Sequence, residues 1–305
     1  MPSAPDADRT NVARSSGDPS FERSVIVTGA RGLVGHYLLP RLVERGYAVQ
    51  AISRRPRPPA HPSEPRAVRW IPMALERPAA LGPADCLIHT APIWLLPRLL
   101  DSVAANGVRR LVAVSSTSRY TKQGSGSPRE RETARRLAEA ESVVEITCRD
   151  RRIRWTILRP TLVYGGGRDH NVSAIARFIA LFGFFPIAGR GTGRRQPVHA
   201  ADLATACLAV VDNPATFDRA YDTPGGETLS YAEMVSRIGR GLGRKPRLMH
   251  LPLPLLRVAL AAGSRLPGLG HLTPDMADRM NADLVFDARA ARLDFGYDPR
   301  PFGFP

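Results

Sequence analysis

Three glycines in the segment TGARGLVG are spaced for binding a phosphate. Gly29, Gly32 and Gly35 follow a short apolar stretch and open a segment whose apolar residues recur at helical spacing. One glycine permits a tight turn, another lets the backbone approach a pyrophosphate, and the third lets a helix pack closely on a strand. The free N–H groups at a helix start attract the anion. The segment therefore predicts a dinucleotide-binding loop, with Leu33 among the cofactor contacts.

The residues after the next apolar stretch decide which dinucleotide is favoured. A carboxylate about twenty residues after the glycines would hold the ribose hydroxyls and repel a 2′-phosphate. Here Ser53 and Arg54 stand in that place. Serine offers a hydrogen bond without a charge, a guanidinium pairs with phosphate, and Arg31 would approach from the glycine loop. We expect NADP, with NAD as the alternative cofactor, unless these arginines merely belong to the surface.

These residues need a sheet to hold them, and the chain supplies alternating strand and helix patterns. Strands are expected at residues 25–28, 48–53, 67–71, 85–91, 110–116 and 153–160, and helices at 33–43, 94–107 and around 132–141. Such alternation with short connections predicts a parallel sheet covered by helices on both faces. We predict an α/β fold, a Rossmann-type doubly wound parallel sheet with a smaller mixed C-terminal substrate lobe.

The pattern also predicts the domain boundaries. Residues 1–22 are polar, rich in Pro and Ser, and lack the apolar core of a signal peptide, so we expect a disordered tail. Residues 23–165 would form the dinucleotide-binding domain and 166–305 the substrate-side lobe, with 195–212 packing back on the sheet. We expect the four phenylalanines within 178–185 to form lobe core, with an apolar substrate pocket or a membrane contact as alternatives.

The composition limits the classes of binding partner that we expect. The 43 basic residues against 28 acidic ones give a net charge of +15, which favours anionic ligands. Lysine occurs only at positions 122 and 245, so arginine supplies the excess. No run of five basic residues and no RNA-binding signature appears, which argues against nucleic acid. We expect a small-molecule substrate, phosphorylated or nucleotide-linked, and leave a homodimer open.

Cysteine usage and hydropathy predict a cytoplasmic protein. Cys86, Cys148 and Cys207 lie far apart and form no CxxC pair, which indicates a reducing compartment and no metal site. The longest apolar stretches are too short, or too interrupted by Arg and Pro, to span a bilayer.

From residue 24 to the end, the chain resembles the extended and atypical short-chain dehydrogenases/reductases, the NAD-dependent epimerase/dehydratase type. TGARGLVG resembles their TGxxGxxG loop, SSTS (115–118) their strand-end serine/threonine pair, and LRPTLVYG (158–165) their RPxxVYG segment. PVHAADLA (197–204) resembles VHVxDxA, and DTPGGETLSYAEM resembles a late element of the family. The resemblance implies a reductase or epimerase acting on a sugar nucleotide or related carbonyl compound.

The catalytic pair of that family is missing from this chain. The family uses a Tyr-x-x-x-Lys pair on the helix after the fifth strand, where the lysine lowers the pKa of the tyrosine. None of the seven tyrosines here is followed by lysine four places on. If Glu141 is the family's helix-closing glutamate, Thr133 or Glu132 stands at the tyrosine position, and Leu137 or Arg136 at the lysine position.

Other side chains would have to replace the lost acid. The resemblance places Ser116 or Thr117 at the reacting oxygen, and Tyr120, just beyond them, would supply the proton. His89, at the end of the fourth strand and near the cofactor ribose, is an alternative acid, although a strand-end histidine more often packs or bonds to backbone. The alternative function is a non-catalytic NADP-binding sensor or a structural subunit, which would need no such pair.

The resemblance also assigns contacts around the cleft. Tyr164 would touch the substrate, and Arg168 four residues later could lower the pKa of its phenol. Asn171 and Arg194 complete the expected substrate side, with Arg194 suited to a diphosphate. Besides those named above, the expected cofactor contacts are Thr90, Ala91 and Pro160.

Overall fold

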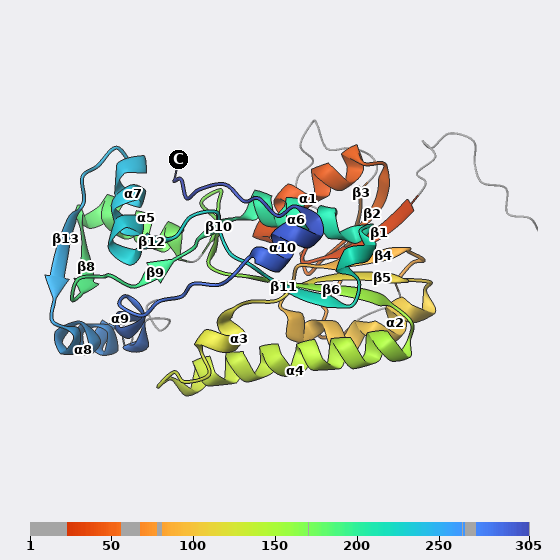
Figure 1. Cartoon of the computed structure of the whole chain (residues 1–305), viewed down its shortest axis with the longest axis horizontal. Helices are drawn as coiled ribbons and strands as arrows, with labels where there is room; N and C mark the ends of the chain where they lie inside the picture. Colours follow the sequence, from red (N-terminus) through yellow and green to blue (C-terminus); the bar gives the residue numbers. More distant parts are fainter. Residues whose placement is uncertain are drawn as a thin grey trace, which may run out of the picture.

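A seven-stranded sheet lies at the centre of the molecule. The computed structural model describes residues 23–55, 68–77, 81–169, 171–263, 265 and 273–304; the predicted tail, 1–22, lies outside them. The strand order is β11-β6-β5-β4-β1-β2-β3, and all neighbours are parallel. The strands are β1 (Arg23–Thr28), β2 (Tyr47–Ser53), β3 (Val68–Pro72), β4 (Cys86–His89), β5 (Arg110–Val114), β6 (Arg154–Pro160) and β11 (Arg219–Thr223). The predicted α/β Rossmann-type fold is confirmed (Figure 1).

Helices cover both faces of the sheet, as Figure 1 shows. One face carries α1 (Leu33–Glu44), α6 (Ala200–Val211) and α10 (Arg289–Phe295), and the other carries η1 (Ile93–Leu99), α2 (Leu100–Ala105) and α4 (Pro128–Asp150). Strand side chains alternate between the faces, so Val25 and Val27 enter the α1/α6 core while Ile26 enters the α4 core. Both layers exclude water from the sheet that positions the glycine loop.

Two helical predictions need correction. The expected helix over 94–107 begins as the 3₁₀ helix η1, because Pro97 lacks the N–H that an α-helix needs, and only α2 is α-helical. We also took Glu141 as the end of its helix, which is wrong: α4 continues to Asp150. Val144 and Cys148 continue its buried face, so packing holds the extra turns against the sheet.

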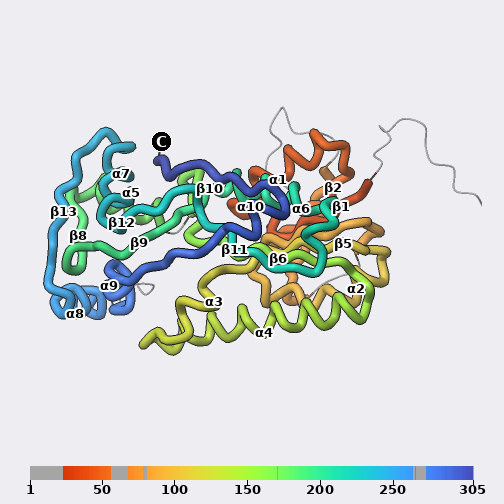
Figure 2. Tube along the Cα trace, in the orientation of Figure 1, coloured from red at the N-terminus to blue at the C-terminus, as the bar shows by residue number. Residues whose placement is uncertain are grey.

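The second half of the chain contributes to both lobes. Beyond the sheet lie α5 (Val172–Phe182), β8 (Phe184–Ala188), α7 (Tyr231–Gly241), β13 (Arg247–Leu251), α8 (Leu253–Gly263) and α9 (Asp275–Arg279). Small elements connect the parts: α3 (Ser118–Thr121), η2 (Pro214–Thr216), and the strand pairs β7 (Val163–Tyr164) with β10 (Val198–His199) and β9 (Arg194–Arg195) with β12 (Leu229–Ser230). We did not expect β11 from the sequence; it returns to pair with β6 at the edge of the sheet (Figure 2).

Candidate functional site

The glycine loop follows β1 at the point where the strand order reverses, between β1 and β4. Such a switch point is where parallel sheets bind ligands. Gly29 has φ +73°, and a Cβ there would lie 2.6 Å from the Ala91 nitrogen and 2.8 Å from the Thr90 carbonyl carbon. A Cβ on Gly35 would collide with the backbone of Ala30. The loop therefore forms a close cradle that only glycine permits, which fits a dinucleotide pyrophosphate.

The start of α1 faces this cradle. Its N-cap residue is Gly32, which has no side chain to satisfy the first N–H groups of the helix, and Leu33 is the first helical residue. An uncapped helix start is suited to an anion. Arg168, from the loop after β7, donates from Nη2 to the backbone carbonyl of Arg31 at 3.3 Å. The fold therefore brings the expected substrate arginine to the expected phosphate loop.

Ser53 and Arg54 lie at the carboxyl end of β2, on the same edge of the sheet as the glycine loop. The Ser53 hydroxyl donates to the backbone carbonyl of Arg55, and Arg54 is exposed. No carboxylate occupies positions 53 to 55 at the end of this strand. The site thus offers hydrogen bonding and positive charge where an adenosine ribose would lie.

His89 is placed differently from the expectation of a ribose contact. Its ring is completely buried, with Nδ1 2.7 Å from the Thr28 hydroxyl and Nε2 3.2 Å from the Pro92 carbonyl. Burial lowers the pKa of the ring to about 4. A neutral, enclosed imidazole is unsuited to proton transfer with a substrate, so His89 holds the ends of β1 and β4 together.

Two hydroxyls follow β5, and their surroundings differ. Thr117 is buried, and its hydroxyl donates to the Pro160 carbonyl at 3.2 Å, at the end of β6. Ser116 is partly exposed, and its Oγ accepts the Ser118 N–H at 3.1 Å while its own hydrogen remains available. Of the two expected partners for a reacting oxygen, the geometry favours Ser116.

Tyr120 lies on α3, four residues after Ser116. The guanidinium carbons of Arg119 and Arg159 lie 5.1 and 5.7 Å from its ring centroid, and the Phe286 ring is 6.2 Å away. Burial raises the pKa of the phenol, and the positive charge of Arg159 opposes this effect only in part. The phenol therefore keeps its proton at neutral pH and can donate it.

A buried carboxylate organises this region. Glu141 of α4 accepts Arg159 Nη2 at 2.7 Å and Nε at 3.0 Å, and also receives Arg119 and the Ser115 hydroxyl. One side chain thus connects α4, β6, α3 and the end of β5. By fixing Arg119 and Arg159, Glu141 fixes the two cations beside Tyr120.

The expected pair positions on α4 are filled by other side chains. Leu137 is buried in the core beneath the helix. The Thr133 hydroxyl donates to the Arg129 carbonyl one turn earlier, at 2.9 Å. Glu132 pairs with Arg135 on the exposed face, and the Arg136 guanidinium lies 4.6 Å from the Trp94 ring centroid.

We missed Asp222 in the sequence. The β11 register sets it opposite Arg159, and its Oδ1 is buried without a hydrogen-bond partner in the described structure. Burial raises the pKa of this carboxyl. Arg119 Nε is likewise buried and lacks a partner. Because buried polar groups are normally satisfied, this donor and acceptor suit a ligand hydroxyl or carbonyl. The signal was a carboxylate at a strand end, three residues before the glycine pair that begins at Gly225.

The expected substrate contacts are not brought together. Tyr164 is fully buried, packs edge-on against His199 and Phe302, and its hydroxyl accepts the Gly303 N–H. Arg194 pairs with Asp283 at 2.7 Å on the surface. Asn171 is exposed at the start of α5, where Asp169 accepts its N–H. Of the expected four, Arg168 alone approaches the glycine loop through a contact in the described residues.

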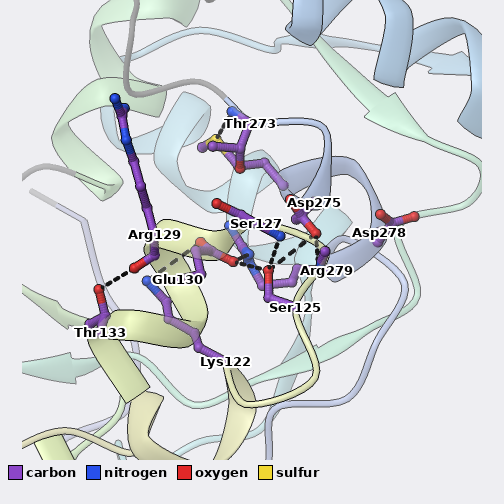
Figure 3. A network of polar contacts seen from close by, with 12 residues as sticks. Lys122, Ser125, Ser127, Arg129, Glu130, Thr133, Thr273, Asp275, Asp278 and Arg279 are labelled. Carbon is purple, nitrogen blue, oxygen red and sulfur yellow. Dashed lines mark hydrogen bonds and ion pairs between the residues drawn. The ribbon is translucent and has the colours of Figure 1, made fainter. Parts of the chain in front are cut away.

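A polar network joins the connection between α3 and α4 to α9 (Figure 3). The Ser125 hydroxyl oxygen lies 2.8 Å from a Glu130 oxygen and 3.1 Å from an Asp275 oxygen, so the two carboxylates share its one hydrogen. Lys122 and Arg279 both pair with Glu130. Burial alone would raise the pKa of Glu130, but the Ser125 hydrogen bond and the two cations bring it below its ordinary value. This network ties the substrate-side lobe to the helix that carries Glu141.

Within the described residues, no group of three His, Cys, Asp or Glu side chains could hold a metal ion. In the same part of the chain, no helix combines the length and apolar character needed to cross a membrane.

The parallel sheet and its glycine cradle define a dinucleotide-binding α/β protein. The model of the NAD dependent epimerase/dehydratase family matches residues 25–92 and 93–222, and the chain belongs to this family. It is 24% identical to 2-alkyl-3-oxoalkanoate reductase of Stenotrophomonas maltophilia, over 90% of this chain and 94% of that protein. It is 29% identical to (4-alkanoyl-5-oxo-2,5-dihydrofuran-3-yl)methyl phosphate reductase of Streptomyces griseus, over 78% of this chain and 80% of that protein.

Solved structures share the fold. MoeE5 in complex with UDP-glucose and NAD superposes with a TM-score of 0.69 at 21% identity, covering 92% of this chain and 94% of that one. UDP-glucose 4-epimerase of Thermotoga maritima, solved with UDP-glucose, gives a TM-score of 0.65 at 17% identity. The match covers 91% of this chain and 94% of that one.

Proposed function

We propose that this protein is an NADP-dependent reductase that delivers hydride to a carbonyl compound, with Tyr120 as the proton donor. The observation that carries the proposal is the state of the Tyr120 phenol. Its pKa is raised, so the phenol carries its proton at neutral pH and is present as a donor, not as a base. Reduction needs an acid at the carbonyl oxygen, whereas epimerisation through an oxidised sugar first needs a base. The site therefore favours reduction.

Each residue has a distinct part in this proposal. The cradle of Gly29, Gly32 and Gly35 would hold the pyrophosphate, and Ser53 with Arg54 would hold the 2′-phosphate. A bound nicotinamide dinucleotide would supply the hydride. The Ser116 hydroxyl would orient the carbonyl oxygen, which then takes the Tyr120 proton.

The substrate proposal rests on the relatives and on the charge of the cleft. Two relatives named above are reductases, one of an oxoalkanoate and one of a phosphate ester. Arg168 at the glycine loop and the unpartnered Arg119 Nε favour an anionic or polar carbonyl compound. A nucleotide-linked sugar, as bound by MoeE5, is the alternative substrate class.

A second candidate function is NADP binding without turnover. The observation that favours it is the burial of Leu137, which leaves a core side chain where a catalytic lysine is expected. Such a protein would report the NADPH level or support an assembly.

The test is calorimetric titration with NADPH and NADH, followed by NADPH oxidation with a panel of 3-oxoalkanoates, keto phosphates and UDP-sugars. Tyr120→Phe should lower kcat/KM by about 10²–10⁴-fold with unchanged NADPH affinity. Tyr47→Phe is the control. Tyr47 lies at the amino end of β2, away from the carboxyl ends of the strands, and this variant should retain full activity. Full activity in Tyr120→Phe would reject the proposed acid. Tight NADPH binding without turnover on any substrate would favour the second candidate.

A further inference from the structure

The strands β8 and β13 lie at the end of the C-terminal lobe that is farthest from the seven-stranded sheet (Figure 1). Large apolar side chains of β13 and of the neighbouring α5 are exposed there. Leu181 is 77% exposed and Phe182 is 58% exposed at the end of α5, and Met249 on β13 is 44% exposed. We call Leu181, Phe182, Phe184, Met249, Arg244 and Arg247 the end patch. Exposed apolar clusters of this kind normally mark a surface that another body covers.

Contacts within the lobe join the end of α5 to the strands β8 and β13 of the end patch. The Phe182 ring centroid lies 4.6 Å from that of Phe178 and 6.1 Å from that of Phe184. β8 and β13 pair in parallel, which sets Phe184 beside Arg247. The Arg247 N–H donates to the Gly183 carbonyl at 3.3 Å, directly after Phe182. The α5 end and the two-stranded sheet therefore form a single apolar ledge.

Basic residues predominate in the two sequence segments that form this ledge. Residues 170–201 and 234–274 contain eleven arginine and lysine residues and no aspartate or glutamate. Four of these basic residues pair with carboxylates from other segments: Arg194, Arg237, Arg240 and Arg257. Arg244 reaches the end of α5, where it donates to the Ala180 carbonyl at 2.7 Å. In the part of the chain that the structure describes, none of Arg177, Arg244, Lys245 and Arg247 forms an ion pair with a carboxylate. These cations remain available to external anions.

We propose that the end patch docks this protein on the surface of an anionic lipid bilayer. Leu181, Phe182 and Met249 would enter the boundary between headgroups and acyl chains, and Arg244 and Arg247 would meet the lipid phosphates. A second copy of the chain is disfavoured because it would bring the same positive charge to the interface. α8, which follows the carboxyl end of β13, carries exposed Leu255 and Val258 outside the end patch.

Vesicle flotation of the full chain tests the proposal independently of any enzymatic activity. Phosphatidylcholine vesicles with and without phosphatidylglycerol are compared at low and high salt. We expect binding only to the anionic vesicles, and at least about a tenfold loss of binding for the double variant Leu181→Ser/Phe182→Ser and for Arg247→Glu. Leu293→Ser on α10, 75% exposed and outside the end patch, and Arg149→Glu near the end of α4 are the matched controls.

Equal losses in the patch variants and in their controls would overturn the proposal, because general attraction of a basic protein would then explain the binding. Failure of the wild type to float with either vesicle would also overturn it. Sedimentation velocity tests the oligomeric state. If the wild type is a dimer and Leu181→Ser/Phe182→Ser is a monomer, the end patch binds a second copy of the chain instead. Unchanged thermal unfolding of each variant confirms that the fold is intact.

Discussion

The Thr28 hydroxyl and His89 Nδ1 lie 2.7 Å apart in the buried layer that joins β1 to β4. On the other side of the ring, Nε2 is 3.2 Å from the Pro92 carbonyl. A carbonyl oxygen only accepts, so Nε2 carries the hydrogen and Thr28 donates to Nδ1. This arrangement satisfies a neutral imidazole, and a second ring hydrogen on Nδ1 would require the Thr28 hydroxyl to turn its own hydrogen away.

Stability should therefore depend on His89 in mildly acidic solution. Burial lowers the ring pKa from 6.5 to about 4, so between these values the unfolded chain binds a proton that the folded protein does not. Stability is complete above pH 6.5 and falls by about 3 kcal/mol as the pH drops to 4. His89→Gln can keep both hydrogen bonds but has no group that titrates. Chemical denaturation of this variant between pH 4 and 6.5 should therefore show a smaller dependence of unfolding free energy on pH. Equal slopes in His89→Gln and in the control His36→Gln would contradict this assignment.

Glu141→Gln should destabilise the protein strongly. The substitution removes the carboxylate that pairs with both Arg119 and Arg159 and leaves only Asp222, whose pKa is raised by burial, close to them, at a cost of about 3–5 kcal/mol. Denaturant unfolding measures the change. Glu139→Gln on the exposed face of the same helix should change stability by less than about 1 kcal/mol. Similar effects at the two sites would show that the buried network does not hold α4 to the sheet.

The variants Gly29→Ala and Gly46→Ala distinguish the energetic cost of a positive φ from the steric effect of a Cβ in the cradle. Both glycines have positive φ, +73° and +78°, but a Cβ on Gly46 meets nothing within 4 Å. Gly46→Ala should cost about 1–2 kcal/mol in unfolding free energy and leave NADPH binding intact. Gly29→Ala forces the loop away from Thr90 and Ala91, so calorimetry should detect little or no NADPH binding. Normal binding by Gly29→Ala would remove the glycine loop from the cofactor site.

Arg54→Ala should change cofactor preference without changing the fold. If Arg54 pairs with the 2′-phosphate, its loss should weaken NADPH binding by about tenfold or more and leave NADH binding unchanged. Arg69→Ala, an exposed arginine on the neighbouring strand β3, is the control. A parallel loss for both dinucleotides would show that Arg54 serves general attraction instead.

The sequence was most informative where chemistry and local structure coincide. A glycine with positive φ and a helix start without a capping side chain are both specified by a few consecutive residues, so they can be predicted without knowledge of tertiary contacts. Gly29, Gly32 and Gly35 lie where that local motif predicts. Ser116 and Tyr120 could also be placed near a strand end, because a parallel strand fixes which of its ends faces the cleft. Their chemical roles remain predictions.

Side-chain direction and long-range pairing could not be predicted in the same way. Whether Tyr164 faces a pocket or the core depends on Phe302, which arrives from the far end of the chain. Arg194 is committed to Asp283 by a contact across 89 positions. The continuation of α4 past Glu141 was within reach, because Val144 and Cys148 extend its apolar spacing.

The return of β11 to the sheet has a consequence for dissecting the molecule. A fragment ending at residue 165 would contain every residue of the glycine loop, yet it would lose β11 from the edge beside β6 and α6 from the face of α1. The exposed backbone of β6 and the uncovered side chains of Leu38 and Leu42 would then be free to join other chains. Such a fragment should aggregate when expressed alone, so a minimal soluble form must retain the chain at least through Thr223.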